Sequence, residues 1–246
     1  MTIRYRLDIS AYLVVGPENT KGRPVGQIVA VAVEAGYTCV QIRSKTASAG
    51  DLIELTRQAA DLIARAGRSD EVALVVNDRL DVVLAAREQG IKVDGIHVGQ
   101  SDIPVAVCRK YLGETSVIGL SAKTCDLFDY VQAADVSQVD YFGVGPLHET
   151  PTKLDSGINL NGKTLTRSFS EIARLVKISS VPIVVGGGVK LADIPQLART
   201  GAGGFFVVSA ISEADDPQTA AAELITAWRA NSRGQSLGGC LWSHSG

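Results

Sequence analysis

The sequence predicts a single (β/α)₈ TIM barrel of the α/β class. Short apolar runs alternate along the chain with longer segments of helical periodicity, which is typical of βα units built on a parallel sheet. The length, 246 residues, is that of one such barrel. Apolar residues make up 46% of the chain and aromatic residues only 5%, as expected for aliphatic strands covered by helices.

The strands are expected where apolar, mostly β-branched runs of four to six residues lie between turn residues. In chain order these runs are Ala11–Val15, Thr38–Ile42, Glu71–Val76, Gly95–Val98, Ser116–Leu120, Asp140–Val144, Pro182–Val185 and Gly204–Val208.

The helices are expected where apolar residues recur at helical spacing after each strand. These segments are Val25–Ala35, Ala49–Ala66, Asp81–Glu88, Val105–Leu112, Cys125–Ala133, Ser168–Val176, Leu191–Arg199 and Pro217–Ala230. An open doubly wound sheet is the alternative architecture, but the first turn reads Gly16-Pro17-Glu18 and lacks the Gly-x-Gly-x-x-Gly fingerprint.

No linker divides the chain. We expect one catalytic domain over residues 1–230 and a disordered tail over residues 231–246, whose Trp242 is the one feature against disorder. The formal net charge of −2, with no basic run, argues against nucleic acid or a membrane surface as partner. No apolar run is long enough to span a bilayer, and nothing in the sequence indicates an oligomeric state. Without Cys-x-x-Cys spacing or a secretory signal, four cysteines are predicted to be free thiols of a cytoplasmic protein: Cys39, Cys108, Cys125 and Cys240.

Candidate site residues follow the strands, because a TIM barrel carries its active site at the carboxyl ends of its strands. Gln41, Arg43 and Lys45 share one register at the end of the second strand, so they can converge on one ligand. Arg and Lys suit phosphate oxygens, although a solvated loop would have the same composition.

Two carboxylates follow adjacent strands and can share a cation. Asp78 follows Asn77 after the third strand, and Asp102 follows the fourth. Mg²⁺ is commonly held by one or two carboxylates together with water and substrate phosphate. Helix capping is the alternative role, and Asp81 is a competing carboxylate. His97 is expected to pack in the barrel wall, since the three histidines have no zinc spacing.

The later strand ends suit an anionic ligand. Ser121 is a possible hydrogen-bond donor after the fifth strand. The loop after the sixth strand offers Thr150, Thr152 and Lys153, a composition that a turn would share. Glycine amides at 186–188 and the segment beginning Val208-Ser209 follow the last two strands, where barrels often bind phosphate.

Together these segments resemble the thiamine phosphate synthase family over nearly the whole barrel. The matching motifs are Gln-x-Arg-x-Lys at 41–45, Asn-Asp at 77–78, His-Val-Gly-Gln-Ser-Asp at 97–102, Gly-Val-Gly-Pro at 143–146 and Thr-Pro-Thr-Lys at 150–153. The resemblance implies a transferase of thiamine biosynthesis. It would join 4-amino-2-methyl-5-hydroxymethylpyrimidine diphosphate to 4-methyl-5-(2-phosphoethyl)thiazole or its carboxylated form, giving thiamine phosphate and pyrophosphate.

The same resemblance implies a role for each matching residue. Gln41, Arg43, Lys45 and Asn77 would hold the pyrimidine diphosphate, with Arg43, Lys45 and Lys153 assisting catalysis. Asp78 and Asp102 would bind Mg²⁺. Ser121 and Lys153 would face the pyrimidine, and the thiazole phosphate would be held by Thr150, Thr152, Gly188, Val208 and Ser209.

Two stretches depart from the family pattern, Gln89–Val93 and the longer, more polar Gly157–Arg167, but neither removes a motif residue. Three rival functions remain at this point. A thiazole tautomerase-like enzyme would not be expected to keep the diphosphate and Mg²⁺ residues. A sugar-phosphate epimerase or isomerase would need carboxylates or histidines placed for proton transfer. A non-catalytic sensor would bind thiazole phosphate alone.

Overall fold

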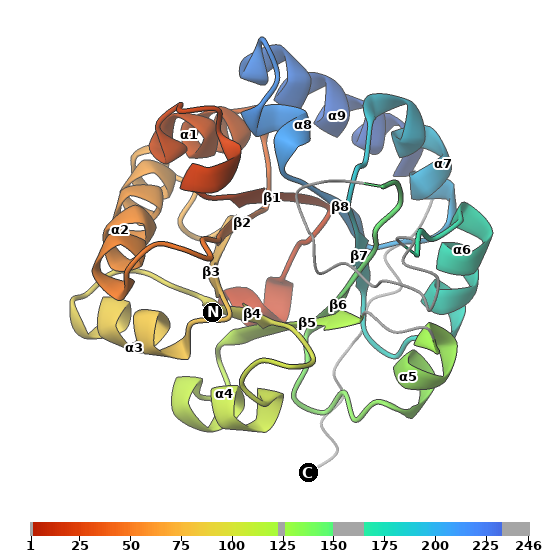
Figure 1. Cartoon of the computed structure of the whole chain (residues 1–246), viewed down its shortest axis with the longest axis horizontal. Coiled ribbons are helices and arrows are strands. Elements are labelled where there is room, and N and C mark those ends of the chain that lie inside the picture. The colour runs from red at the N-terminus through yellow and green to blue at the C-terminus, as the bar shows by residue number, and fades with distance from the viewer. Residues whose placement is uncertain (1, 123–125, 150–164, 233–246) are drawn as a thin grey trace.

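The computed structural model describes residues 2–122, 126–149 and 165–232. Its strands form one closed parallel barrel in which each strand pairs with the next and β8 pairs with β1. The helices form an outer ring around the strands (Figure 1). The predicted (β/α)₈ barrel is therefore confirmed. In the described part of the chain, no helix is long and apolar enough to cross a membrane.

The eight strands match the expected runs to within a few residues. They are β1 Ala11–Val15, β2 Cys39–Ile42, β3 Ala73–Asn77, β4 Gly95–Val98, β5 Val117–Ala122, β6 Tyr141–Val144, β7 Ile183–Val185 and β8 Gly204–Val207. β3 was expected to begin at Glu71 but begins at Ala73. It starts later because the N–H groups of Glu71 and Val72 both donate to the carbonyl of Arg68, forming a turn.

The helices also follow the prediction closely. They are α1 Val25–Ala35, α2 Ala49–Arg65, α3 Leu80–Glu88, α4 Val105–Leu112, α5 Leu127–Ala133, α6 Phe169–Ile178, α7 Ile194–Arg199, α8 Ser209–Ser212 and α9 Pro217–Ser232. The segment expected as one helix from Leu191 splits into the 3₁₀ turn η3 (Leu191–Asp193) and α7, with Pro195 in the first turn of α7. The sequence did not predict α8 or the 3₁₀ turns η1 (Ile3–Arg6) and η2 (Pro17–Asn19), which are too short for periodicity to mark.

The apolar core has two layers, one between barrel and helices and a smaller one inside the barrel. The inner layer contains Tyr12 and Tyr141, both at most 1% exposed. Gly119 makes room for it, because a Cβ there would lie 2.2 Å from Cζ of Tyr141 and 2.5 Å from Nδ1 of His97. A glycine in β5 thus allows two rings to meet inside the barrel.

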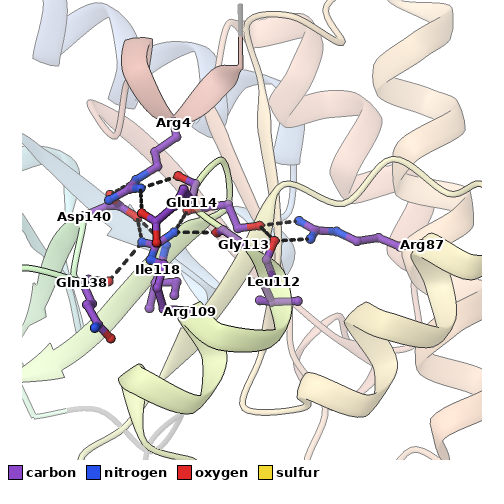
Figure 2. Close-up of polar contacts among 10 residues, drawn as sticks. Arg4, Arg87, Arg109, Leu112, Gly113, Glu114, Ile118, Gln138 and Asp140 are labelled. Atoms are coloured by element: carbon purple, nitrogen blue, oxygen red, sulfur yellow. Dashed lines mark hydrogen bonds and ion pairs between the residues drawn. The ribbon is translucent and has the colours of Figure 1, made fainter.

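The N-terminal end of the barrel is closed by polar contacts with Asp140 at their centre (Figure 2). Its two carboxylate oxygens accept from Arg4 Nε at 2.7 Å and from Arg109 Nη2 at 3.1 Å. The Ile118 amide adds a third bond at 2.7 Å. These bonds fix η1 across the opening, where the neighbouring Ile3 is buried in the inner core. The other end of the barrel carries the candidate site.

Candidate active site

A cavity opens at the carboxyl ends of the strands. Its inner wall is made of side chains that point into the barrel, and its upper wall is made of loop residues after β6 and β7. The inner residues are Tyr12, Val14, Gln41, His97, Ser121, Val184 and Phe206, and the loop residues include Gly145, Pro146, Gly186 and Gly187. The cavity thus joins an apolar surface to a few fixed polar groups, as small-molecule sites do.

Two side-chain amides that the sequence analysis placed in the site, those of Gln41 and Asn77, lie side by side on neighbouring strands. Gln41 on β2 donates from Nε2 to Oδ1 of Asn77 on β3 at 2.6 Å, and both side chains are buried. Asn77 donates in turn from Nδ2 to Oδ2 of Asp78 at 2.6 Å. The cavity wall is therefore connected directly to the carboxylate at the end of β3.

Asp78 and Asp102 form an acidic pair. Burial, reinforced by the neighbouring charge of Asp102, raises the pKa of Asp78 to about 6, while the charge of Lys45 opposes this shift. Asp78 has a φ of 60°, and its N–H donates to the carbonyl of His97 on β4 at 2.9 Å. Asp102 accepts from the Gly99 amide at 2.8 Å. A carboxylate whose ionisation is disfavoured by burial and by a second carboxylate beside it suits a bound cation.

Asp81, the competing carboxylate, has another partner. Its two oxygens accept from Nε and Nη2 of Arg79 in a bidentate ion pair, with a distance of 2.8 Å to Nε. Among the described residues, no group of three or more His, Cys, Asp or Glu side chains could hold a metal ion. A cation at Asp78 and Asp102 would therefore take its other ligands from water and substrate.

The loop that carries Arg43 and Lys45 is held by a residue that the sequence analysis missed. β2 ends at Ile42, so these two side chains belong to the loop rather than to a continuing strand, although the Arg43 amide still donates to Val15 at 2.9 Å. Glu18, in η2, accepts from the Ser44 hydroxyl and from the Lys45 amide at 3.0 Å.

Thr46 adds a third group to the contacts of Glu18, with a hydroxyl bond of 2.8 Å. Burial alone would raise the pKa of Glu18, but these bonds, with Ser44 first among them, bring the pKa below its ordinary value. Glu18 is thus an ionised carboxylate that orders the Lys45 loop. The signal in the sequence was an acidic residue in the turn that follows β1, at the same end of the barrel.

Ser121 lies on the cavity wall and is bonded to His97. Their Oγ and Nε2 atoms are 2.9 Å apart, and Nδ1 of His97 lies 3.1 Å from the hydroxyl of Tyr141. His97 also stacks on the Tyr141 ring with centroids 5.5 Å apart. The prediction that His97 packs in the barrel wall is confirmed. The sequence analysis did not identify Tyr12 or Tyr141 as residues near the site. The signal for each was a tyrosine at an inward-pointing position of an otherwise apolar strand.

The remaining predicted residues follow β6, β7 and β8. Gly187 and Gly188 have φ of 80° and 75°, and a Cβ at Gly187 would lie 2.6 Å from Cβ of Pro146, so the turn needs glycine. Val208 precedes α8 and Ser209 begins it, so the first amides of this helix lie at the end of β8. Thr150, Thr152 and Lys153 lie outside the described residues.

Comparison with known proteins shows the same family throughout. Residues 11–211 match the profile described as thiamine monophosphate synthase. The chain is 38% identical over 226 residues to a thiamine-phosphate synthase of Chloroflexus aurantiacus, covering 91% of this chain and 94% of that protein. It is 37% identical over 221 residues to one of Corynebacterium efficiens, covering 89% and 94%.

Comparison with solved structures supports the same family. A thiamine phosphate pyrophosphorylase from Pyrococcus furiosus is similar with a TM-score of 0.72 and 25% identity, covering 93% of this chain and 98% of that one. A (S)-3-O-geranylgeranylglyceryl phosphate synthase from Thermoplasma acidophilum shares only the fold, with a TM-score of 0.62, 12% identity, and coverage of 94% and 99%. The chain therefore belongs to the thiamine phosphate synthase family and is an enzyme of thiamine biosynthesis, a transferase that forms thiamine phosphate.

Proposed function

We propose that the enzyme joins 4-amino-2-methyl-5-hydroxymethylpyrimidine diphosphate to 4-methyl-5-(2-phosphoethyl)thiazole in the cavity described above, with Mg²⁺ at Asp78 and Asp102. The observation that carries the proposal is the acidic pair, joined by hydrogen bonds through Asn77 to Gln41 on the cavity wall. A cation held by the pair would lie beside the pyrimidine pocket, where a diphosphate can reach it.

The diphosphate would be held by the residues next to this pair. Arg43 offers a planar fork and Lys45 a point charge, and both suit phosphate oxygens. Glu18 supports this role, because its carboxylate accepts from the Lys45 amide and orders the loop that carries Lys45. Lys153, whose role is inferred from the family motif alone, would add a further positive charge.

The reaction would begin with the break between the pyrimidine methylene carbon and the diphosphate oxygen. The electron pair leaves with pyrophosphate, and Arg43, Lys45 and Lys153 stabilise the developing charge. A bound Mg²⁺ would neutralise part of that charge. The thiazole nitrogen then donates its lone pair to the methylene cation and forms the new carbon–nitrogen bond. No proton is transferred and no protein nucleophile is required.

The thiazole phosphate would be held at the ends of β7 and β8. Gly188, Val208 and Ser209 provide main-chain N–H groups there, and Thr150 and Thr152 would add hydroxyls. Anchoring the phosphate keeps the thiazole nitrogen close to the methylene carbon. Positioning of this kind removes much of the entropic barrier and limits capture by water.

The apolar wall supports the placement of the pyrimidine. Val14, Val184 and Phe206 can pack against a flat ring, while Gln41 and Ser121 meet its polar edge. We further propose that residues 1–230 act as one catalytic domain in a reducing cytoplasm, since Cys39 and Cys108 are buried free thiols.

The direct test mixes the purified protein with both substrates and Mg²⁺ and measures pyrophosphate and thiamine phosphate together. Equal release of both, stopped by a chelator, is the expected result. Arg43→Ala should lower turnover by about 100-fold, on the scale of losing one charge-stabilising donor. The matched control is Arg57→Ala, which removes an exposed arginine of α2 that pairs with Glu54. Loss of activity in both variants, or in neither, would refute the role of Arg43.

Lys153→Ala should reduce kcat more than it raises the KM for thiazole phosphate, because the charge that it stabilises develops on the pyrophosphate. Unchanged kcat would remove Lys153 from the mechanism. Binding of thiazole phosphate without any coupling would instead favour the tautomerase-like or sensor function.

A further inference from the structure

An unbroken chain of hydrogen bonds runs through the barrel from Asp78 to Ser121. It passes through five side chains on five different strands, and no donor–acceptor distance exceeds 3.1 Å. In order the links are Asp78–Asn77 at 2.6 Å, Asn77–Gln41 at 2.6 Å, Gln41–Tyr12 at 2.7 Å, Tyr12–Tyr141 at 2.8 Å, Tyr141–His97 at 3.1 Å and His97–Ser121 at 2.9 Å.

The Asp78 end sets the direction of the first three links. Asn77 donates from its NH₂ group to Oδ2 of Asp78, so it presents its carbonyl to Gln41. Gln41 must then present its NH₂ group to Asn77, which leaves its carbonyl facing Tyr12. A carbonyl only accepts, so the single hydroxyl proton of Tyr12 is committed to Gln41.

The direction continues to the far end. Because the Tyr12 proton is already donated, the bond between the two hydroxyls must carry the proton of Tyr141. The Tyr141 oxygen can then only accept from Nδ1 of His97, which fixes the neutral imidazole as its Nδ1–H tautomer. Nε2 has no proton in that tautomer, so it must accept the proton of Ser121.

Burial keeps the middle of the chain in this state. Desolvation raises the pKa of Tyr12 and of Tyr141 well above that of a free tyrosine, so both hydroxyls keep their protons. Burial likewise raises the pKa of the Cys39 thiol beside Tyr12, so the thiol keeps its own proton and does not accept one from the hydrogen-bond chain. Gly119 and Gly143 leave the space in which the rings meet, since a Cβ at Gly143 would lie 3.0 Å from Cε1 of His97.

We infer that this chain makes Ser121 an obligate hydrogen-bond acceptor toward the substrate, with Tyr12, Tyr141 and His97 as positioning residues. The inference rests on the proposed function. The neutral aminopyrimidine has N–H groups only on its exocyclic amine. The amine must therefore face Ser121. A pyrimidine that has only a hydrogen-bond acceptor at that position is rejected, because the lone pair of the acceptor would face a lone pair of the Ser121 oxygen.

The first experiment reads the His97 tautomer without any substrate. The protein is labelled with ¹⁵N-histidine, and a His97→Gln variant identifies the signals of His97 among the three histidines. Wild-type protein is expected to show a protonated Nδ1 and an unprotonated Nε2. An Nε2–H tautomer in the wild-type protein would overturn the inference.

The second experiment breaks the chain at Tyr141. Tyr141→Phe removes the acceptor of Nδ1, so the Nε2–H tautomer should become populated and Ser121 should become free to donate. The KM for pyrimidine diphosphate should rise about tenfold, on the scale of one hydrogen bond. The KM for thiazole phosphate should stay within about twofold, because its proposed site lies at the ends of β7 and β8.

The matched control is Tyr37→Phe. Tyr37 is also a fully buried tyrosine, but its hydroxyl has no hydrogen-bond partner among the described residues. This variant should leave both the tautomer and the KM unchanged. If Tyr141→Phe does not fold, Tyr12→Phe tests the same link, since it frees the Tyr141 proton to turn toward His97. An unchanged tautomer and KM in the variant that folds would refute the inference.

A substrate analogue tests the partner of Ser121. Replacing the exocyclic amine of the pyrimidine diphosphate by hydrogen should weaken binding to wild-type protein but not to Ser121→Ala, and equal weakening in both would overturn the assignment. Failure of the proposed function and failure of this inference would give different results. Wild-type protein that forms no thiamine phosphate refutes the proposed function, whereas active protein with the Nε2–H tautomer refutes this inference alone.

Discussion

Replacing Asp78 by Asn should stabilise the metal-free protein at neutral pH while abolishing its response to Mg²⁺. The structure gives the magnitude. Burial first, and then the charge of Asp102, raises the pKa of Asp78 from 3.8 to about 6. Each unit corresponds to about 1.4 kcal/mol, so the full shift would be worth about 3 kcal/mol. The carboxylate is partly exposed, and solvent screening reduces this to about 1.5 kcal/mol.

The effect depends on pH in a defined direction. The folded-state pKa lies above that of a free carboxyl, so ionisation of Asp78 opposes folding. Below pH 3.8 the group is protonated in both states and the destabilisation is absent; it grows as the pH rises and is complete above about 6. Asn keeps the acceptor for Asn77 and tolerates the φ of 60° at this position.

The assay is thermal unfolding with a chelator at pH 4 and pH 8. Asp78→Asn should unfold about 3–6 °C above wild type at pH 8 and at nearly the same temperature at pH 4. Added Mg²⁺ should raise the Tm of wild type but not of the variant, whose turnover should be lost. Asp81→Asn is the control, because Asp81 pairs with Arg79 and should retain both the Mg²⁺ response and activity. A Tm difference that is the same at both pH values would refute the electrostatic argument.

Three further predictions concern single side chains. Tyr37→Phe removes a buried hydroxyl that has no hydrogen-bond partner in the described part of the chain, and it should raise the free energy of unfolding by about 1 kcal/mol in urea titrations; a loss of stability would show that the hydroxyl is satisfied. Arg109→Met should lower the same free energy by about 3 kcal/mol, since it leaves the buried carboxylate of Asp140 with one cation fewer, and a change below 1 kcal/mol would contradict this. Glu18→Gln should raise the KM for pyrimidine diphosphate about fivefold, because a neutral amide holds the Lys45 loop less firmly, with little change in Tm; an unaltered KM would mean that the loop orders itself.

The sequence predicted those parts of the site that depend on strand ends. Gln41 and Asn77 meet, and Asp78 lies beside Asp102, because parallel neighbours in a barrel bring their carboxyl ends to one rim. That relation needs only the order of the strands and their approximate bounds, which apolar runs and turn residues provide. The same reasoning placed His97 in the barrel wall.

Contacts set by exact geometry could not be predicted. Glu18 reaches the Lys45 loop because η2 turns the chain back across the rim, and periodicity does not describe a three-residue turn. The meeting of Tyr12 with Tyr141 depends on the shear of the barrel and on the space left by Gly119, neither of which is visible in a linear pattern. The short helix α8 was not predicted, for the same reason as η2.

The N-terminal end is closed by η1, with Arg4 hydrogen-bonded to Asp140, and among the described residues the candidate cavity opens at the opposite end of the barrel. If the pyrimidine binds in this cavity and the thiazole phosphate at the ends of β7 and β8, as proposed, the pyrimidine would lie deeper in the barrel than the thiazole. A molecule bound at the bottom of a pocket can leave only after the molecule that covers it has left. With the sites as proposed, substrates would therefore bind, and products would leave, in a fixed order.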